Sequence, residues 1–352
     1  MPPPSFSHKP LPAGYILDVY QFERVLGSPG TFGITYAARN VKNGKRLAIK
    51  ELFPSDYVIR DGTHRVVVQT KSDEQVLVEA VRMFRQEATI LSKVQHDNVI
   101  KVLDYLEANG TGYMVMNYED GYDLQIHLDK QKPNRLNENE LRRLLMPLLD
   151  GLATVHRLNY LHRDIKPSNI YLTREHIPLL LDFGAARQMI VSRSRPVEQI
   201  LTPPYGPIEQ YGKTSPQGPY TDIYAMGVVL FRAMLANERF PNAPDRMTHD
   251  PVVPLTRRLK GQEYSAGFLS AVDWALRFRA EDRPQTIHAW REAIEASQPK
   301  QRSHSKRTSY LEKLGRLRTR NQHAFWKLVA IIAGIVFGII ALATLITYLL
   351  MG

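Results

Sequence analysis

Nine consecutive residues, 162–170, place an acidic, a basic and an amide side chain within one short stretch of the sequence. The Asp164 carboxylate can accept a proton, the Lys166 ammonium can neutralise an anion, and Asn169 can offer an oxygen to a hard cation. Transfer of a phosphoryl group requires these three kinds of group. Pro167 restricts the backbone between them, and the apolar residues on both sides indicate that the segment is anchored in a core. Taken alone, the same residues also fit an ordinary loop.

The length and the cysteine content limit the classes of protein that the chain can belong to. At 352 residues it is longer than an average domain, so it can form one two-lobed domain or two separate modules. It contains no cysteine. This excludes a disulfide framework, thiolate zinc sites and cysteine nucleophiles, so any bound metal must be held by oxygen or imidazole ligands.

The net charge of +11 is concentrated near the C-terminus. Residues 300–327 include nine basic residues and one acidic residue, Glu312, which together give +8 of the +11. The basic residues are Lys300, Arg302, Lys306, Arg307, Lys313, Arg316, Arg318, Arg320 and Lys327. The remainder of the chain is close to balanced, which argues against nucleic acid as a partner of the main domain.

The two ends of the chain differ in character. Residues 1–13 are proline-rich and polar and lack the apolar run of a signal peptide, so we expect a disordered, mobile arm. Residues 328–350 are uncharged and mostly aliphatic, and they are long enough to cross a bilayer as a helix. A buried core helix is the alternative, but such helices are rarely apolar on all sides over this length. The basic segment before this predicted transmembrane helix favours a juxtamembrane linker and a cytoplasmic N-terminal portion, as in a single-pass, tail-anchored membrane protein.

The spacing of apolar residues predicts an α+β chain with a small sheet-rich lobe followed by a helix-rich lobe. Strands are expected at 22–26, 34–38, 47–50 and 113–118, with one helix at 75–93. After Gly121 the period becomes helical, with five leucines between 141 and 149 on one face. Later helices are expected at 222–235, 267–278 and 286–296, and the proline- and glycine-rich span 203–219 is expected to be a surface loop.

Three glycines, Gly27, Gly30 and Gly33, lie with Phe32 between the first two predicted strands. Backbone amides in such a glycine-rich loop can approach phosphate groups closely. In isolation, the cluster also fits a plain turn.

Three charged residues follow the glycines in an order that suits phosphate chemistry. Lys50 ends the next predicted strand and Glu87 lies in the predicted helix beyond it, which suits a phosphate-binding lysine with an acidic partner. Asp182 follows an apolar run eighteen residues after Asp164, so a strand, turn and strand can return it to the same place. Individually, these residues also fit surface charges or a turn, but their ordered occurrence together is not expected by chance.

These motifs resemble those of the protein kinase superfamily, specifically the eukaryotic-type (Hanks-type) serine/threonine kinases found in bacteria. The quoted motifs are Gly-Ser-Pro-Gly-Thr-Phe-Gly, Ala-Ile-Lys, His-Arg-Asp-Ile-Lys-Pro-Ser-Asn and Asp-Phe-Gly, and the resemblance covers about residues 20–296. It implies a bilobal protein-kinase fold over residues 14–297, with an N-lobe over 14–118 and a C-lobe over 119–297. The basic linker, 298–327, and one C-terminal transmembrane helix would follow.

The resemblance implies a role for each residue of the transfer reaction. Lys50 would contact the α- and β-phosphates of ATP and would be held by Glu87. Asp164 would be the base for the substrate hydroxyl, and Lys166 would stabilise the γ-phosphate. A lysine two places after this aspartate is typical of serine/threonine kinases.

The resemblance also implies a metal site and a nucleotide site. Asn169 and Asp182 would bind Mg²⁺, with Mn²⁺ as an alternative. The nucleotide would contact the glycine loop, the strand of Lys50 and the hinge between the lobes. The implied nucleotide-binding residues are Gly27, Gly30, Phe32, Gly33, Ala48, Lys50, Met116, Asn117, Tyr118 and Glu119.

The sequence departs from the family pattern in three places. The glycine loop is one residue longer than usual and contains Pro29, which lacks an N–H donor, and this bears on nucleotide affinity. Asn117 replaces the glutamate that is common in the hinge. The 36 residues between Lys50 and Glu87 form a long connection, in which we expect an extra strand pair that includes residues 66–69.

Further likenesses concern structural contacts. Glu209, in Pro-Ile-Glu, resembles the family's acid that pairs with an arginine, here Arg283. Asp222 resembles the buried helix acid that braces the catalytic loop.

Four residues are candidates for regulation. Arg163 stands next to the implied base and, by the resemblance, contacts a phosphate on the activation segment, residues 182–209. Ser192 and Ser194, each next to an arginine, are candidate phosphorylation sites, although they also fit a solvated loop. Thr202 resembles the substrate-side threonine.

The function implied by the resemblance is an ATP-dependent serine/threonine protein kinase acting on cytoplasmic proteins, with autophosphorylation, in membrane-linked signalling at a bacterial inner membrane. ATP, protein substrates and membrane lipid are the expected partners, and dimerisation is left open. The alternatives are a pseudokinase that acts as a membrane scaffold or nucleotide-dependent binding module, and a small-molecule kinase.

Overall fold

The computed structural model describes residues 10–27, 30–130, 135–184, 204–212, 214–236 and 238–297. The predicted linker and the predicted transmembrane helix at 328–350 lie outside the described residues, as do Pro29, Ser192, Ser194 and Thr202. Among the helices in the described ranges, none combines the length and the apolar character needed to cross a membrane.

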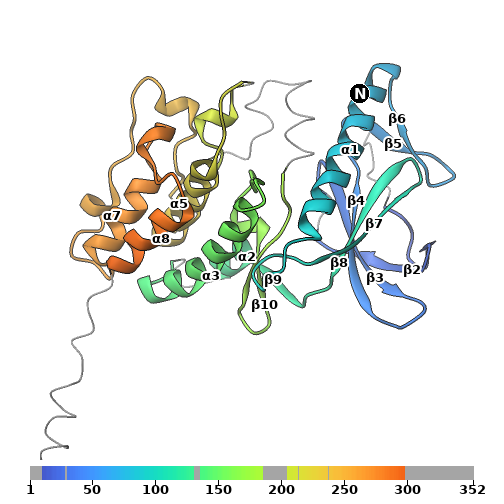
Figure 1. The fold of residues 1–352 in the computed structure, drawn as a ribbon, viewed down its shortest axis with the longest axis horizontal. Helices are drawn as coiled ribbons and strands as arrows, with labels where there is room; N and C mark the ends of the chain where they lie inside the picture. The colour runs from blue at the N-terminus through green and yellow to red at the C-terminus, as the bar shows by residue number, and fades with distance from the viewer. Residues whose placement is uncertain are drawn as a thin grey trace, which may run out of the picture. The chain divides into compact units, whose positions relative to one another are not determined.

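The N-lobe is built on a six-stranded antiparallel sheet in the order β1-β2-β3-β4-β8-β7 (Figure 1). Its strands are β1 (Ile16–Leu17), β2 (Tyr20–Val25), β3 (Gly33–Asn40), β4 (Arg46–Leu52), β7 (Val102–Ala108) and β8 (Thr111–Asn117). Helix α1 (Glu74–Leu91), preceded by the short helix η1 (Lys71–Asp73), packs against β4, β7 and β8. All four predicted strands and the predicted helix of this lobe are confirmed, with small differences in their ends.

The connection between β4 and α1 contains an additional hairpin, as predicted. Strands β5 (Val58–Arg60) and β6 (Val66–Val68) pair in antiparallel fashion and form a separate two-stranded sheet. Val58 and Val66 are buried in a cluster with residues of β2, β3, β4 and β8. The hairpin therefore covers part of the N-lobe sheet.

The two faces of the N-lobe sheet belong to two different cores. Leu47 and Ile49 of β4 are buried in the cluster that includes the hairpin, whereas Leu52 is buried in the cluster that includes α1. This follows from the strand geometry, because successive side chains point to opposite faces of a sheet.

One part of the N-terminal prediction was wrong. We expected a mobile arm to residue 13, but Leu11 is 3% exposed and belongs to the core beside the hairpin. Its N–H donates to the hydroxyl of Tyr36 at 3.1 Å. Because burying an apolar side chain and satisfying a buried donor both favour a fixed position, the folded domain includes Leu11.

The C-lobe consists mainly of helices, together with a three-stranded sheet in the order β11-β10-β9 (Figure 1). Its strands are β9 (Gly121–Asp123), β10 (Ile170–Thr173) and β11 (Pro178–Leu180). Its α-helices are α2 (Leu124–Lys130), α3 (Glu138–His156), α5 (Pro219–Leu235), α6 (Leu255–Arg258), α7 (Ala266–Ala275) and α8 (Ile287–Ala296). Its short 3₁₀ helices are η2 (Pro167–Asn169), η4 (Ile208–Gln210), η5 (Pro244–Arg246) and η6 (Ala280–Asp282).

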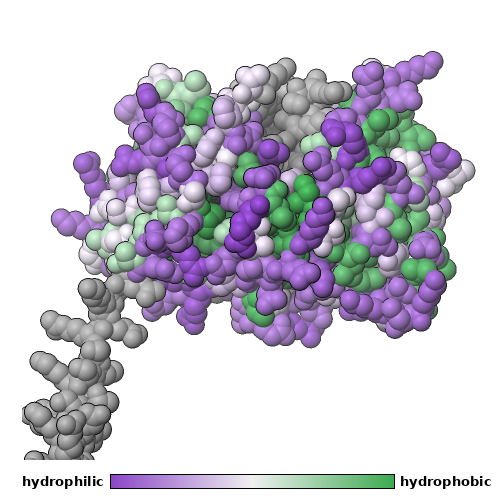
Figure 2. All heavy atoms as spheres, viewed as in Figure 1, coloured by the Kyte–Doolittle hydropathy of each residue, from purple (hydrophilic) through white to green (hydrophobic). Residues whose placement is uncertain are grey.

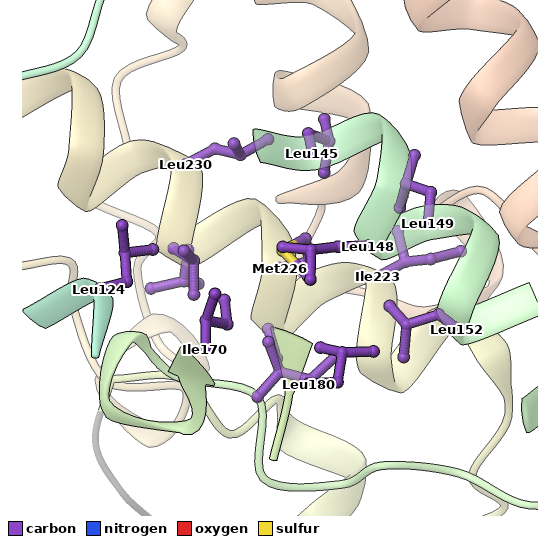
Figure 3. Packing of buried hydrophobic residues seen from close by; sticks show 14 of the residues in the cluster. Leu124, Leu145, Leu148, Leu149, Leu152, Ile170, Leu180, Ile223, Met226 and Leu230 are labelled. Carbon is purple, nitrogen blue, oxygen red and sulfur yellow. The ribbon is translucent and has the colours of Figure 1, made fainter. Parts of the chain in front are cut away.

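Helix α5 runs through the interior of the C-lobe, with most of its side chains buried. Figure 3 shows its residues Ile223, Met226 and Leu230 together with leucines of α3 and with Ile170 and Leu180 of the small sheet. Ile170 directly follows Asn169, and Leu180 lies two residues before Asp182. The core of the C-lobe thus fixes both segments that carry the predicted site residues.

Helix α7 is shorter at its C-terminal end than the sequence predicts. Helix α7 ends at Ala275, three residues before the predicted end. The carbonyl oxygens of Arg277 and Phe278 accept hydrogen bonds from the Arg283 guanidinium at 2.8 and 2.6 Å. Arg283 thus satisfies two carbonyls that lie beyond the end of the helix.

The face of the described domain in Figure 2 is mostly hydrophilic, in agreement with the burial of its large apolar side chains. Figure 2 shows that hydrophilic residues cover most of the visible face of the described domain, with hydrophobic residues in smaller groups between them. This pattern is expected when the large apolar side chains lie in two interior clusters.

Candidate active site

Three side chains of the segment between α3 and β10 are joined by hydrogen bonds. The Lys166 ammonium donates to Asp164 Oδ2 at 2.9 Å, and Asn169 Nδ2 donates to the same oxygen at 2.9 Å. Asn169 Nδ2 also donates to the backbone carbonyl of Asp164 at 2.8 Å. The three groups that the sequence singled out therefore form one cluster, in which the Asp164 carboxylate is held in a fixed orientation.

The backbone before Asp164 is held by Asp222 of α5, whose side chain is fully buried. Its carboxylate accepts the N–H of His162 at 2.9 Å and the N–H of Arg163 at 2.8 Å. Arg163 has a left-handed backbone with φ 66°, which costs free energy in a non-glycine residue. The predicted brace is confirmed as a contact, and it compensates for this backbone conformation.

The pKa of Asp222 reflects these contacts. Burial alone raises the pKa of this carboxyl, but the hydrogen bond and charge of His156, together with the other donors, hold it below the ordinary value of 3.8. Asp222 therefore remains an acceptor for the loop at neutral pH.

The carboxylate of Asp182 links the C-lobe to β4. Its Oδ1 accepts a hydrogen bond from the Lys50 ammonium at 2.9 Å, although the two residues are 132 positions apart. Burial raises the pKa of Asp182 and the positive charge of Lys50 lowers it, with a net pKa below the usual value. Asp182 has φ 53°, a second left-handed non-glycine residue at the site.

Glu87, on α1, is 2% exposed and faces the same region as Lys50. Burial lowers the pKa of Lys50, but the charges of Asp182, Glu87 and Asp164 together raise it above its usual value. The structure thus brings Lys50 under the influence of all three predicted acids. Within the part of the chain that the structure describes, Lys50 forms its ion pair with Asp182 and not with Glu87, as the resemblance had implied, and Glu87 acts on Lys50 only through its charge.

The segments of Asp164 and Asp182 are packed against each other. The ring of Phe183 stacks on His162, with centroids 4.3 Å apart, and the N–H of Gly184 donates to the carbonyl of His162 at 2.9 Å. A Cβ atom at Gly184 would lie 3.0 Å from Cβ of Asp164. The close approach of the two segments therefore favours glycine at this position.

The predicted glycine loop joins β2 and β3. Gly27 has φ 66°, and the N–H of Gly30 donates to the carbonyl of Gly33 at 3.0 Å. A Cβ atom at Gly33 would lie only 2.7 Å from the carbonyl oxygen of Glu51 on the neighbouring strand. Phe32 packs against the core that contains α1. The end of the loop therefore lies beside β4, the strand of Lys50, as its neighbour in the sheet.

The predicted hinge follows directly from β8. Ala48 pairs with Met116 in the sheet, so these two nucleotide-site candidates are neighbours on adjacent strands. Lys45 donates to Asn117 Oδ1 at 3.3 Å. The Arg46 guanidinium lies 4.2 Å from the centre of the Tyr118 ring.

Glu119 completes the predicted hinge. The backbone carbonyl of Glu119 accepts a hydrogen bond from the Tyr171 hydroxyl at 3.2 Å. Burial, together with the charges of Glu175 and Asp120, raises the pKa of its carboxyl. The hinge is thus tied to β10 through its backbone.

The predicted ion pair of Glu209 and Arg283 is confirmed. Arg283 Nη1 lies 2.7 Å from Glu209 Oε1, and both side chains are almost completely buried. Thr221, in the first turn of α5, also donates to Glu209 at 3.0 Å. The pair joins the end of the activation segment to the helical core.

The sequence matches the model of the protein kinase domain over residues 20–292. The chain belongs to the protein kinase family.

Two curated kinases illustrate this relationship. The chain is similar to serine/threonine-protein kinase pkn2 of Myxococcus xanthus, with 29% identity over 299 residues, covering 81% of this chain and 33% of pkn2. It is also similar to serine/threonine-protein kinase Nek3 of Mus musculus, with 30% identity over 215 residues, covering 61% of this chain and 37% of Nek3. The chain spans about a third of the length of these relatives.

Solved kinase structures show the same fold. The apo form of PpkA-294 is 36% identical with a TM-score of 0.73, and the match covers 81% of this chain and 99% of PpkA-294. The PknI kinase domain of Mycobacterium tuberculosis is 22% identical with a TM-score of 0.61, covering 82% of this chain and 99% of that domain, and at this identity it supports the fold alone.

Two contacts of the kinase site were not expected from the sequence. His156, at the end of α3, places Nε2 2.8 Å from Asp222 Oδ2, and Gln210 donates to the carbonyl of Arg163 at 2.8 Å. Neither residue lies in a motif that bears chemistry, so its contact depends on the tertiary fold.

Proposed function

We propose that this kinase-family chain is an ATP-dependent serine/threonine protein kinase, which transfers the γ-phosphate of ATP to hydroxyl groups of protein substrates. The observation that supports this most directly is the joined cluster of Asp164, Lys166 and Asn169, together with the Lys50–Asp182 ion pair. These residues come from both lobes and from distant parts of the sequence. Phosphoryl transfer depends mainly on positioning and charge neutralisation, which such a cluster provides.

The roles proposed for the site residues come from the family resemblance, and the contacts around each residue support them. Asp164 would orient the substrate hydroxyl and accept its proton, because its carboxylate is fixed by two donors. Lys166 lies next to it and would neutralise charge on the transferred phosphoryl group. Lys50 would contact the α- and β-phosphates, with Glu87 and Asp182 keeping its ammonium charged.

The donor set fits Mg²⁺. Both N–H bonds of the Asn169 amide are directed at Asp164, so its Oδ1 is the atom that can meet a cation. Asp182 is ionised, with its pKa below the usual value as described above. Two protein oxygens suit an ion that takes its remaining ligands from phosphate and water, and when bound it would neutralise the charge of the phosphates.

The nucleotide would lie between the glycine loop and the hinge. Gly27, Gly30, Phe32 and Gly33 would cover the phosphates, since their loop leads into β3, the strand next to that of Lys50. Ala48, with Met116, Asn117, Tyr118 and Glu119, would receive the adenine from the opposite side.

The decisive experiment is phosphate transfer from labelled ATP to a generic basic protein. Asp164→Asn and Lys50→Met should each lower the rate by on the order of 100-fold or more, because the first removes the proton acceptor and the second removes the positive charge that positions and neutralises the phosphates. Asp120→Asn is a suitable control, since Asp120 is an exposed neighbour of the hinge paired with Arg174 at 3.7 Å. Equal rates in all four proteins would contradict catalysis and favour a pseudokinase.

We also propose that the kinase phosphorylates itself within the activation segment. Arg163 would contact a phosphate there, with Ser192, Ser194 and Thr202 as the candidate acceptors. Mass spectrometry after incubation with MgATP should find phosphate in this segment of the wild type and none in Asp164→Asn. Unmodified wild-type protein would refute this part of the proposal.

A membrane location is proposed from sequence alone. The apolar segment 328–350 and the basic segment before it support a tail anchor with the kinase domain on the cytoplasmic side. The full chain should remain in the membrane fraction after alkaline extraction, whereas a chain ending at Ser297 should not. Extraction of both proteins would contradict the anchor.

A further inference from the structure

Glu51 is a buried carboxylate directly next to Lys50 in the sequence. Its side chain is 0% exposed and shares the face of β4 with Leu47 and Ile49, in the core beside the hairpin. An apolar residue is expected at such a position, because an ionised group without partners is very costly to bury. The surroundings of Glu51 must therefore compensate for its burial.

Three donors surround this carboxylate. Arg60 Nη2 lies 2.6 Å from Glu51 Oε2, and the hydroxyls of Tyr36 and Tyr113 donate to Oε2 and Oε1, each at 2.8 Å. Tyr36 lies on β3 and Tyr113 on β8, the two strands that flank β4. The carboxylate thus joins three adjacent strands through their side chains.

Arg60 brings the β5–β6 hairpin into this cluster. Its side chain is 2% exposed, and its Nη1 donates to the carbonyl of His64 in the hairpin turn at 3.0 Å. The guanidinium lies 5.1 Å from the centre of the Phe53 ring. Burial lowers the pKa of Arg60, but the hydrogen bond and charge of Glu51 raise it overall, so the guanidinium stays charged.

A second layer of contacts extends the cluster. The N–H of Leu11 donates to the Tyr36 hydroxyl at 3.1 Å, and Asn109 Nδ2 donates to the Tyr113 hydroxyl at 3.1 Å. The N–H of Val66 donates to the carbonyl of Asn109 at 2.7 Å. The hairpin is therefore attached to the turn between β7 and β8 as well as to β4.

The hairpin lies in the chain between β4 and α1, beside the N-terminal end of that helix (Figure 1). After β6, the N–H of Gln69 donates to the carbonyl of Tyr57 at 2.8 Å, and the Gln69 side-chain amide donates to the carbonyl of Ser55 at 3.0 Å. Thr70 and Asp73 then form the cap that leads into α1 at Glu74. When the hairpin is fixed on β4, only a few residues between β6 and α1 are left that are not held by the hairpin.

The geometry points to Glu51 and Arg60 as positioning residues for phosphate transfer, because their buried pair fixes the hairpin on β4 and thereby sets the position of α1, with its Glu87, relative to Lys50. This inference rests on the proposed function, since Glu87 acts there by keeping the Lys50 ammonium charged. Neither residue of the pair touches the reacting groups. The competing explanation is that the pair only stabilises the N-lobe.

Steady-state kinetics of the full chain test the inference. Arg60→Met should lower kcat at saturating ATP by on the order of 10-fold to 100-fold, since small displacements of catalytic groups have effects of this size. Arg60→Lys keeps the charge but not the forked donor geometry, so its kcat should lie between those of Arg60→Met and wild type. Arg39→Met, which removes an exposed pair with Glu23 at 3.0 Å, is the matched control and should stay within about twofold.

Stability must be separated from positioning. Rates are measured at a temperature at which circular dichroism shows every variant to be folded, because Arg60→Met should lower Tm by roughly 6 °C or more. The double variant Glu51→Met/Arg60→Met replaces the ion pair with apolar side chains and should recover much of Tm. If kcat recovers together with Tm, the pair acts through stability alone and the inference is overturned.

Hydrogen exchange gives a readout that does not depend on activity. Amides of α1 should exchange faster in Arg60→Met and in the double variant than in wild type and Arg39→Met. Unchanged α1 exchange in a folded Arg60→Met protein would overturn the inference. If the wild type transfers no phosphate, the proposed function fails, and the exchange comparison still decides whether Arg60 positions α1.

Discussion

The ammonium of Lys50 on β4 and the carboxylate of Asp182 after β11 form an ion pair of 2.9 Å between the two lobes. The pair is made from two groups that would each contact the nucleotide, one through its phosphates and one through the metal. It therefore keeps two oppositely charged groups close together at the junction of the lobes. When ATP and Mg²⁺ are bound, the Lys50 ammonium would contact the phosphates and the Asp182 carboxylate would contact the metal ion.

Asp182→Asn should weaken the response to Mg²⁺. The substitution keeps the size of the side chain but removes its charge, so the rate at saturating ATP should fall by on the order of 100-fold and more Mg²⁺ should be needed. Initial rates over a series of Mg²⁺ concentrations measure both effects, and removal of Mg²⁺ with EDTA should abolish transfer in the wild type. A variant with the wild-type Mg²⁺ dependence would show that Asp182 does not bind the metal.

Gly33→Ala should be more harmful than Gly30→Ala. The new Cβ at position 33 would lie 2.7 Å from the carbonyl of Glu51, so β3 or β4 must shift, whereas at position 30 the nearest atom is 3.6 Å away. We expect Gly33→Ala to destabilise the protein by about 1–3 kcal/mol and to raise KM for ATP, with Gly30→Ala within about 0.5 kcal/mol of wild type. Urea unfolding and ATP kinetics of the two variants check this, and equal stability would contradict the close contact.

Arg283→Met should cost more stability than Glu209→Gln. Arg283 donates hydrogen bonds to the carboxylate of Glu209. It also donates to the backbone carbonyls of Arg277, Phe278 and Tyr220, at 2.8, 2.6 and 3.4 Å. Glu209→Gln should cost about 3 kcal/mol, because it leaves a buried guanidinium without its counter-charge, while Arg283→Met also leaves these carbonyls unsatisfied.

Chemical denaturation measures this difference. The control is Arg174→Met, which removes the exposed pair with Asp120 and should change the free energy of unfolding by less than about 1 kcal/mol. A smaller loss in Arg283→Met than in Glu209→Gln would show that the carbonyl contacts contribute little.

Much of the fold was predictable because local patterns and motifs agree. The alternation in β4, the apolar face of α3 and the order of the motifs all predicted the bilobal kinase fold, and the partners of Glu209 and Asp222 followed from the resemblance. These features depend on residues near one another in sequence or on positions shared by the family.

The cluster around Glu51 was not predictable in the same way. The alternation in β4 puts Glu51 on the face of Leu47 and Ile49, where an acid is not expected, and its partner Arg60 lies on an inserted hairpin whose packing the sequence does not specify. The fixed position of Leu11 was missed for a related reason. Its proline-rich sequence surroundings indicated disorder, but in the tertiary structure its side chain is buried in a hydrophobic core. Contacts of this kind arise only when distant segments meet.

His162 should make the stability of the folded domain depend on pH. Burial lowers its pKa below the ordinary 6.5, and the charges of Asp222 and Asp164 only partly offset this effect. The unfolded chain therefore binds the proton more readily than the folded chain. The contribution of uncharged His162 to the free energy of unfolding is complete above pH 6.5, and it is lost as the pH falls through the lower pKa of the folded state. Asp222, whose pKa is below 3.8, has its effect only at lower pH.

Unfolding in urea at a series of pH values between about 5 and 7.5 tests this dependence. The free energy of unfolding should fall with decreasing pH, with a slope of up to about 1.4 kcal/mol per pH unit from this group. His162→Asn keeps an acceptor for the N–H of Asp164, which now donates to His162 Nδ1 at 3.3 Å, but it cannot titrate, so its curve should be flatter. His288→Asn replaces a histidine that is 81% exposed and should retain the wild-type slope. An unchanged slope in His162→Asn would show that another group is responsible, because stacking on Phe183 affects the stability at every pH and cannot by itself produce a slope.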